Sequence, residues 1–463
     1  MQNKQEQIPL WRQLQATAQV IQSVREGQSG GVAVEAVATD LRPGVQALAF
    51  YAWRNLGRAE ALRKQLAKRP PPPAVDALLC VALALAWQDE GAPYDAFTLV
   101  NQCVEAAKRH PDTRAQASFV NACLRRFLRE REALVASTDN DPVARWNHPA
   151  WWIARLKKDH PQGWQALLHS ANRQAPMTLR VNALQGSVAD YLGALEQAGF
   201  AARAVGSSGI ELERAVPVGQ LPGFASGRVS VQDAAAQVAA PLLLGQLPPA
   251  ASAAGSAPIG TPSSTQAGAP QRAAMRVLDA CAAPGGKTGH LLELGASHVT
   301  ALDVDGARCE RIGQNLARLG LQAEVLAADA ARPDLWWDGK PYDAVLLDAP
   351  CTASGIVRRH PDVRWLRRET DIAQLAALQK KLLQALWPLL APGGRLLYCT
   401  CSVFLAEGAE QVQTFLAHHT DAVLLPSPGH LIPPNSPKTG GVPDNQQGDH
   451  DGFFYALLQK LAA

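Results

Sequence analysis

The sequence lacks the features of a membrane or secreted protein. Its longest apolar run, residues 77–87, is only 11 residues long, whereas a membrane-spanning helix needs about 18. The opening MQNKQEQIPLWRQL has no apolar core of the kind found in secretory signals. No Cys-x-x-Cys pair occurs among the eight cysteines, so we expect no zinc site, and the cysteine usage suits a reducing cytosol. These absences predict a cytoplasmic protein that uses neither a membrane nor a metal.

The chain also lacks a large excess of charge of either sign. There are 44 Lys and Arg residues against 41 Asp and Glu, a net charge of +3. This balance neither requires nor excludes a nucleic-acid partner, so local clusters of charge matter more than the sum. A hydrophobic fraction of 47% permits large cores, and 463 residues are enough for two to four domains.

Three regions differ in pattern. Residues 1–142 carry apolar side chains at helical spacing, as in VQALAFYAWRNL, which predicts an all-α domain. Residues 143–228 mix short strand and helix patterns, which predicts a small α+β domain. Residues 229–463 alternate strand and helix patterns, which predicts a doubly wound, Rossmann-like α/β domain. We expect this domain to begin with a helix in SVQDAAAQVAAPLLLG. Within it, residues 246–273 are almost free of charge and rich in Ala, Gly, Ser and Pro, so we expect a flexible insertion there.

The α/β domain carries a glycine turn that suits a cofactor. Its first expected strand runs into DACAAPGGKTGHLLEL, and ligands of such folds bind at the carboxyl ends of the strands. A dinucleotide fingerprint needs G-x-G-x-x-G, which is absent, and a P-loop fails because Cys281 replaces its first glycine. S-adenosylmethionine needs only close backbone approach. Asp303 and Asp329, each at an expected strand end, favour it, although either alone could be a turn residue.

Two cysteines are expected to share one cleft with a carboxylate. The fourth strand leads into Asp348 and Cys351, and the fifth ends beside Cys401. Because these strands are expected to be neighbours, their ends should face each other. Cysteine often merely packs in a core, and we assign that role to Cys399 and to the cysteines within helical patterns.

Several motifs resemble one enzyme family. DACAAPGGKT, DAPCTASGIVRRHPDVRW, YCTCS and the terminal HDGFFYA resemble the RNA 5-methylcytosine methyltransferases. VNQCVEAAK and FVNACLRRFLRER resemble the all-helical RNA-binding NusB domain, and HPAWW, LRVN and VSVQDAAAQ resemble the segment that joins it to the catalytic domain. The combination is similar to the RsmB (Sun/Fmu) family of bacterial 16S ribosomal RNA methyltransferases over nearly the whole chain, except for the charge-free insertion.

The resemblance implies roles for named residues. The attacking thiol would be Cys401, which adds to carbon 6 of cytosine, and Cys351 would assist release of the product. Asp348 would hold or protonate the ring nitrogen, and Lys287 would bond the base carbonyl and lower the pKa of a nearby thiol. The implied cofactor is S-adenosyl-L-methionine, and its positions carry over to Cys281, Ala282, Ala283, Pro284, Gly285, Gly286, Lys287, Asp303, Asp329 and Asp348.

A group of arginines follows the DAPC motif and is interpreted as an RNA contact. A solvated basic loop is the alternative, but a target base in folded RNA must be held out of its stack, which favours phosphate contacts. We predict that RNA is bound by Arg358, Arg359, Arg364, Arg367 and Arg368, and by Arg125 and Arg126 of the helical region. The expected partner is 16S ribosomal RNA, naked or in an early small-subunit particle, and nothing in the sequence requires more than a monomer.

Three other functions compete with a methyltransferase of 16S ribosomal RNA. A catalytically idle RNA-binding or assembly factor is opposed by the presence of both cysteines and Asp348. An ATP-using P-loop protein is opposed by Cys281. A methyltransferase acting on another RNA would carry the same catalytic motifs.

Overall fold

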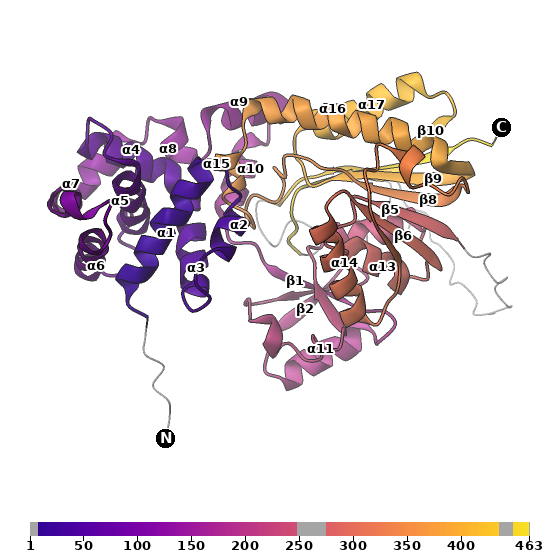
Figure 1. The fold of residues 1–463 in the computed structure, drawn as a ribbon, viewed down its shortest axis with the longest axis horizontal. Helices are drawn as coiled ribbons and strands as arrows, with labels where there is room; N and C mark the ends of the chain where they lie inside the picture. Colours follow the sequence, from indigo (N-terminus) through magenta and orange to yellow (C-terminus); the bar gives the residue numbers. More distant parts are fainter. Residues whose placement is uncertain (1–7, 248–274, 435–447, 463) are drawn as a thin grey trace, which may run out of the picture. The chain divides into compact units, whose positions relative to one another are not determined.

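The computed structural model describes residues 8–247, 275–434 and 448–462. Contacts divide the chain into two units. The helical unit consists of Met1–Gln174 and Val357–Glu369, and the sheet unit of Ala175–Ile356 and Thr370–Ala463 (Figure 1). Most of the expected low-complexity insertion, residues 248–273, lies outside the described residues. No helix within the described ranges is long and apolar enough to cross a membrane.

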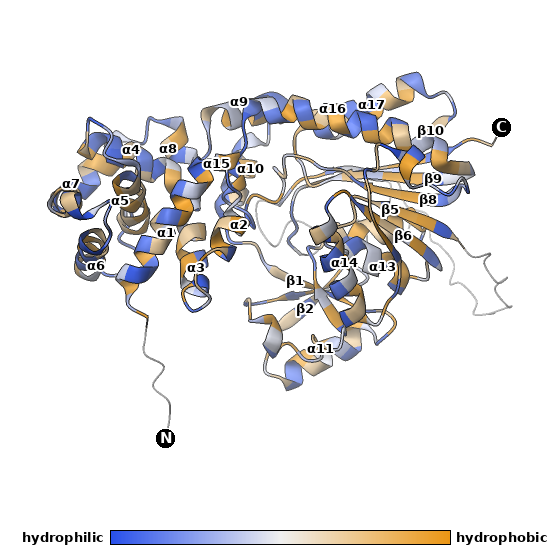
Figure 2. Cartoon of the chain, viewed as in Figure 1, coloured by the Kyte–Doolittle hydropathy of each residue, from blue (hydrophilic) through white to orange (hydrophobic). Residues whose placement is uncertain are grey.

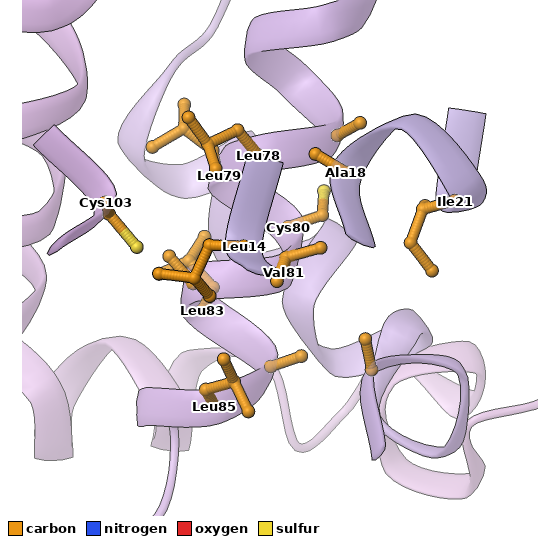
Figure 3. Packing of buried hydrophobic residues seen from close by; sticks show 14 of the residues in the cluster. Leu14, Ala18, Ile21, Leu78, Leu79, Cys80, Val81, Leu83, Leu85 and Cys103 are labelled. Carbon is orange, nitrogen blue, oxygen red and sulfur yellow. The ribbon is translucent and has the colours of Figure 1, made fainter. Parts of the chain in front are cut away.

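The helical unit is built around one helix that is apolar on every side. Helix α5 (Pro73–Ala86) is coloured as hydrophobic around its circumference in Figure 2, and a helix of that kind must be buried. Leu14, Ala18 and Ile21 of α1 and Cys103 of α6 pack around it (Figure 3). The helices of this unit are α1 (Leu10–Arg25), α2 (Gly30–Glu35), α3 (Arg42–Arg54), α4 (Leu56–Leu66), α5, α6 (Ala96–Arg109), α7 (Ala117–Ser137), α8 (Pro142–Trp146), α9 (Ala150–Asp159), α10 (Trp164–Asn172) and α15 (Val363–Leu366).

The helical unit extends past the expected boundary at residue 142. Helices α8 to α10 belong to it by contacts, whereas the sequence placed them with the α+β domain. Asn147 ends α8 in the left-handed conformation, and its side-chain oxygen accepts a hydrogen bond of 3.0 Å from the backbone N–H of Arg58 in α4. The short helix expected in NHPAWWIARLKKD is α9, which packs against α8 and α10.

The sheet unit begins with a small antiparallel sheet. Its strand order is β2 (Ala202–Val205), β3 (Gly209–Leu212), β1 (Met177–Val181), β4 (Val229–Val231), with α11 (Val188–Gln197) packed beside it. The helix expected from residue 230 is wrong at its start. Ser230 pairs with Arg180 in the sheet, and helical structure resumes only in α12 (Ala239–Leu243) after a short 3-10 turn. The sheet's need for a fourth strand outweighs the local helical pattern.

The second sheet has seven strands in the order β10-β11-β9-β8-β5-β6-β7. Five neighbours are parallel: β5 (Arg276–Ala280), β6 (His298–Asp303), β7 (Glu324–Ala327), β8 (Tyr342–Asp348) and β9 (Leu390–Thr400). The antiparallel edge consists of β11 (Phe453–Lys460) and β10 (Ala422–Leu431), the latter not predicted from the sequence.

Helices cover both faces of this sheet, which confirms the predicted doubly wound fold (Figure 1). Helices α12, α13 (Gly286–Glu293) and α14 (Gly306–Leu319) pack on one face, and α16 (Glu369–Leu386) and α17 (Ala409–His418) pack on the other. The chain order reverses between β5 and β8, so the crevice for a ligand is expected outside the carboxyl ends of these strands.

Candidate active site

Two thiols meet at the carboxyl ends of β8 and β9. These strands are parallel neighbours, with Asp348 in register with Cys399. The chain turns after each strand end and places Cys351 and Cys401 with their sulfur atoms 3.4 Å apart, at hydrogen-bond distance. The structure thus brings together two cysteines that are 50 residues apart in the sequence.

Cys351 is the thiol that keeps its proton. Its hydrogen bond with Cys401, and then its burial, raise the pKa of Cys351 well above the ordinary value of a thiol. Only 8% of the residue is exposed. Cys351 therefore holds its proton, and its thiol lies within hydrogen-bond distance of the Cys401 sulfur. Cysteine reacts as a nucleophile in its thiolate form.

A lysine–carboxylate pair lies beside the thiols. Lys287 Nζ of α13 donates to Asp348 Oδ2 at 2.6 Å. Burial alone would lower the pKa of Lys287, but the negative charge of Asp348 and its hydrogen bond with Lys287 raise it instead. Lys287 is therefore a fixed positive charge at neutral pH, positioned to stabilise a thiolate or a developing oxyanion.

Cys399 is part of the core. Its side chain is buried among residues of α12, α13 and the central strands, and its thiol donates to Asp348 Oδ1 at 3.5 Å. Burial raises the pKa of Cys399 well above the ordinary range. Cys399 therefore packs in the core, as predicted from the sequence, and its hydrogen bond helps to orient Asp348.

The glycine turn between β5 and α13 has an unusual backbone. Cys281 and Gly285 both have positive φ angles, +61° and +92°. A Cβ on Gly285 would lie 3.1 Å from Ile312 Cγ2, so glycine suits both the conformation and the close approach to α14. Asn315 of α14 donates to the carbonyl of Pro284 at 2.7 Å, which fixes the turn against that helix.

Carboxylates surround the turn. Asp303 ends β6 and accepts from the backbone N–H of Ala283 at 3.2 Å. Asp329 follows β7 and its side chain is exposed. Asp279 lies under the turn, fully buried; burial raises its pKa to about 7, although Thr288 donates to its Oδ2 at 2.6 Å. Its Oδ1 has no hydrogen-bond partner among the described residues.

Arg180 of β1 also belongs to the site, although the sequence did not predict it. Its buried guanidinium donates to both oxygens of Glu293 in α13, at 2.7 and 3.0 Å. It also donates to the carbonyl of Gly286 at 2.7 Å, and to Gln232. Arg180 therefore ties the small sheet to the glycine turn. The available signal was a charged residue inside the apolar strand pattern of PMTLRVNAL.

The structure corrects part of the predicted RNA surface. Arg358 and Arg364 belong to the helical unit and are 1% and 0% exposed. Arg364 donates to the carbonyls of Asn147 and Ala171, at 3.2 and 2.7 Å, and to the side chain of Asn172. Both side chains are buried in the fold, and that of Arg364 satisfies carbonyl groups that need donors.

The other predicted RNA-contact residues lie nearer the surface. Arg368 is exposed, and Arg359 and Arg367 are half-buried. Arg125 and Arg126 are exposed on α7, where Arg126 pairs with Glu130 at 3.0 Å. They remain candidates for RNA contact.

Known proteins share all three regions. The family described as 16S rRNA methyltransferase RsmB/F matches residues 266–459, a ferredoxin-like domain of RsmF/B-like methyltransferases matches 148–219, and the NusB family matches 14–129. Ribosomal RNA small subunit methyltransferase B of Vibrio cholerae is 38% identical over 96% of this chain and 96% of its own length. The Pseudomonas syringae protein of the same name is 42% identical over 90% of this chain and 89% of its own.

Solved structures agree with these matches. The crystal structure of PH0851 is similar with a TM-score of 0.68 and 25% identity, and covers 96% of this chain and 99% of that one. A methyltransferase homolog from Pyrococcus horikoshii matches with a TM-score of 0.53 and 26% identity, over 69% of this chain and 98% of its own. With an N-terminal NusB domain, a ferredoxin-like domain and a Rossmann-like methyltransferase domain, this chain belongs to the ribosomal RNA small subunit methyltransferase B family.

Proposed function

We propose that the protein transfers a methyl group from S-adenosyl-L-methionine to carbon 5 of a cytosine in 16S ribosomal RNA, through a covalent bond between Cys401 and the base. The observation that carries the proposal is the pair of thiols 3.4 Å apart, beside the Lys287–Asp348 pair. The relatives' names refer to methylation of small-subunit ribosomal RNA, and supply the proposed substrate.

The residues around the turn fit the proposed cofactor. A phosphate is opposed by Cys281, which stands in place of the first P-loop glycine, and by the carboxylates of Asp303 and Asp348 at the turn. A sulfonium cation suits these two carboxylates better than an anion would. The turn from Cys281 to Lys287 would hold its amino-acid part, Asp303 its ribose hydroxyls and Asp329 its adenine. When bound, S-adenosylmethionine supplies an electrophilic methyl group.

The two thiols divide the chemistry between them. Carbon 5 of cytosine is a weak nucleophile, and addition of the Cys401 thiolate to carbon 6 makes it enamine-like. Asp348 holds or protonates the ring nitrogen, and Lys287 bonds the base carbonyl, so that the charge developing on the ring is stabilised. After methylation the carbon 5 proton passes to water, its bonding electrons form the double bond between carbons 5 and 6, and the bond from carbon 6 to sulfur breaks to return the Cys401 thiolate. Cys351, whose thiol keeps its proton, assists this release by donating a hydrogen bond to the leaving sulfur.

RNA binding would use the helical unit and the exposed arginines. The NusB match covers residues 14–129, which include Arg125 and Arg126. Arg359, Arg367 and Arg368 follow the Cys351 loop in sequence. We infer phosphate contacts for these five side chains, with the protein acting as a monomer on naked 16S RNA or on an early small-subunit particle.

The test is methyl transfer from labelled S-adenosylmethionine to unmodified 16S RNA by the natural protein, Cys401→Ala and Cys351→Ala. We expect label in 5-methylcytosine with the natural protein and none with Cys401→Ala. Cys351→Ala should accumulate a protein–RNA adduct that survives denaturing electrophoresis. Cys103→Ala, in the core of the helical unit, is the matched control and should form no adduct.

Full activity of Cys401→Ala would refute the assignment of the nucleophile. Label in a base other than cytosine would refute the proposed target. If the natural protein binds RNA and cofactor but transfers nothing to 16S RNA, the proposal fails for that substrate and another RNA must be tried.

A further inference from the structure

A buried carboxylate lies behind the two thiols and contacts both of their loops. Glu407 occupies the 3-10 turn (Leu405–Glu407) that follows β9, and it is 0% exposed. One of its oxygens accepts from the backbone N–H of Thr352 at 2.8 Å, and the other accepts from the Thr352 hydroxyl at 2.5 Å and from the Ser402 hydroxyl at 2.6 Å.

The partners of Glu407 are the immediate neighbours of the reactive cysteines. Thr352 follows Cys351 and Ser402 follows Cys401. One carboxylate therefore bridges two loops that are about 50 residues apart in the chain. Its contacts reach each loop one residue from the sulfur-bearing position, so a shift of the carboxylate would move both thiols.

The same two loops are joined a second time nearby. The hydroxyls of Ser354 and Ser402 are 2.8 Å apart, and Ser354 Oγ accepts from the backbone N–H of Val403 at 2.9 Å. The backbone N–H of Gly355 donates to the carbonyl of Cys401 at 2.9 Å. The direction of these bonds is fixed from Glu407 outward: Ser402 gives its proton to the carboxylate, so Ser354 must donate to Ser402.

Gln379 of α16 completes the network on the far side. Its amide donates to the carbonyl of Pro350 at 2.9 Å and to Glu407 at 3.3 Å, and its carbonyl accepts from the Tyr398 hydroxyl at 3.1 Å. Burial raises the pKa of Glu407, but the hydrogen bonds from Ser402 and Thr352 oppose that rise. All of these groups lie within the sheet unit.

We propose that Glu407 is a positioning residue for the two-thiol reaction, which holds Cys351 and Cys401 at reacting distance by clamping the residue after each. This inference rests on the proposed function. It adds a requirement beyond the presence of the two cysteines. The loops that carry Cys351 and Cys401 must stay joined while the base is attached to one sulfur and released with help from the other. A misplacement of about 1 Å can cost roughly 100-fold in rate.

Glu407→Ala and Glu407→Gln separate positioning from simple stability. Alanine removes the acceptor of four buried donor groups, whereas glutamine can keep some of the bonds because the two hydroxyls can turn and accept from its amide. Glu410→Ala, an exposed glutamate three residues away, is the matched control. We expect the turnover number to fall about 100-fold in Glu407→Ala and less in Glu407→Gln, with KM for both substrates nearly unchanged.

A second measurement reports on the accessibility of the Cys351 loop and does not depend on methyl transfer. The proteins are treated with iodoacetamide, and the labelling rates of Cys351 and Cys399 are compared by mass spectrometry. Both are buried in the natural protein, Cys351 in the loop and Cys399 in the core strand. Loss of the clamp should raise the labelling of Cys351 about 10-fold or more while Cys399 stays protected. A general loss of stability would expose both.

The outcomes distinguish this proposal from the proposed function. If Glu407→Ala labels Cys351 no faster than the natural protein and transfers methyl groups at a normal rate, the clamp is refuted. Equal gains at Cys351 and Cys399 also refute it, because they show a purely structural role. If the natural protein transfers no methyl group yet Cys351 alone opens in Glu407→Ala, the clamp stands and the proposed chemistry fails.

Discussion

Replacing Arg180 by methionine should strongly destabilise the sheet unit. The substitution removes the ion-pair partner of Glu293, whose side chain is 1% exposed, and it also takes a donor from the Gly286 carbonyl. Breaking a buried ion pair by removing one partner costs about 3 to 5 kcal/mol, because the remaining charge is buried unpaired. For a unit of this size, each kcal/mol lowers the melting temperature by about 2 to 4 °C, so we expect a fall of roughly 6 to 20 °C.

The loss of stability caused by Arg180→Met should depend on pH. Burial raises the pKa of Glu293, and Arg180 opposes that rise. Without Arg180 the folded-state pKa moves higher, so the folded state takes up a proton more readily than the unfolded state does. Stability then falls as the pH rises through the window between the unfolded and folded values. The difference between Arg180→Met and the natural protein should be largest near pH 8 and smaller near pH 5.

The assay is scanning calorimetry at several pH values, with the sheet-unit transition identified by its response to S-adenosylmethionine. Arg180→Met/Glu293→Leu is the decisive partner variant, because replacing both charges by apolar groups is often neutral. It should recover most of the stability, yet still bind the cofactor about 10-fold more weakly, since the Gly286 carbonyl has lost its donor. A single variant as stable as the natural protein, or a pH-independent loss, would refute the reasoning.

Four further outcomes are expected. The natural protein should lose a few kcal/mol of stability as pH rises from about 4 to 7, because the folded state holds the Asp279 proton with a pKa of about 7, and Asp279→Asn should abolish this loss. Urea unfolding at pH 5 and 8 measures it, and an unchanged dependence of stability on pH in the variant counts against it. Lys287→Met should slow methyl transfer about 100-fold with RNA affinity retained, as followed in single-turnover assays; a normal rate would show that the charge is not needed. Arg364→Met should speed amide exchange in α8 and α10, while the exposed Arg368→Met should not; equal exchange in both would contradict the buried role. Changing Arg125 and Arg126 together to glutamine should weaken RNA binding and flatten its dependence on salt by about two units of slope, and an unaltered slope would remove them from the RNA surface.

The sequence was informative where function depends on local chain geometry. The turn from Cys281 to Gly286 follows a strand and opens a helix, and the strands leading to Asp348 and Cys401 are continuous apolar runs, so their positions could be read directly. The adjacency of β8 and β9 followed from the rules of parallel sheets.

Contacts between distant residues could not be read in that way. Arg180 and Glu293 are 113 residues apart, and nothing local to either indicates the other. The arginines after Cys351 looked like one basic loop, because charge spacing does not reveal that Arg364 turns inward to satisfy the carbonyls of Asn147 and Ala171. Glu407 was not predicted for the same reason, since Thr352, the partner that joins it to the second loop, is 55 residues away.

The placement of residues 357–369 in the helical unit has a consequence for synthesis on the ribosome. Asp362 accepts from the backbone N–H of Gly30 at 2.9 Å, and Trp365 donates to the carbonyl of Trp53 at 2.7 Å. About 180 residues of the sheet unit are made after the first 174 and before this segment. At 5 to 20 residues per second, residues 357–369 are therefore synthesised roughly 10 to 40 s after the N-terminal helices of the helical unit. A fragment ending at residue 174 would lack this segment permanently, and would leave these buried partners of α2 and α3 open to water.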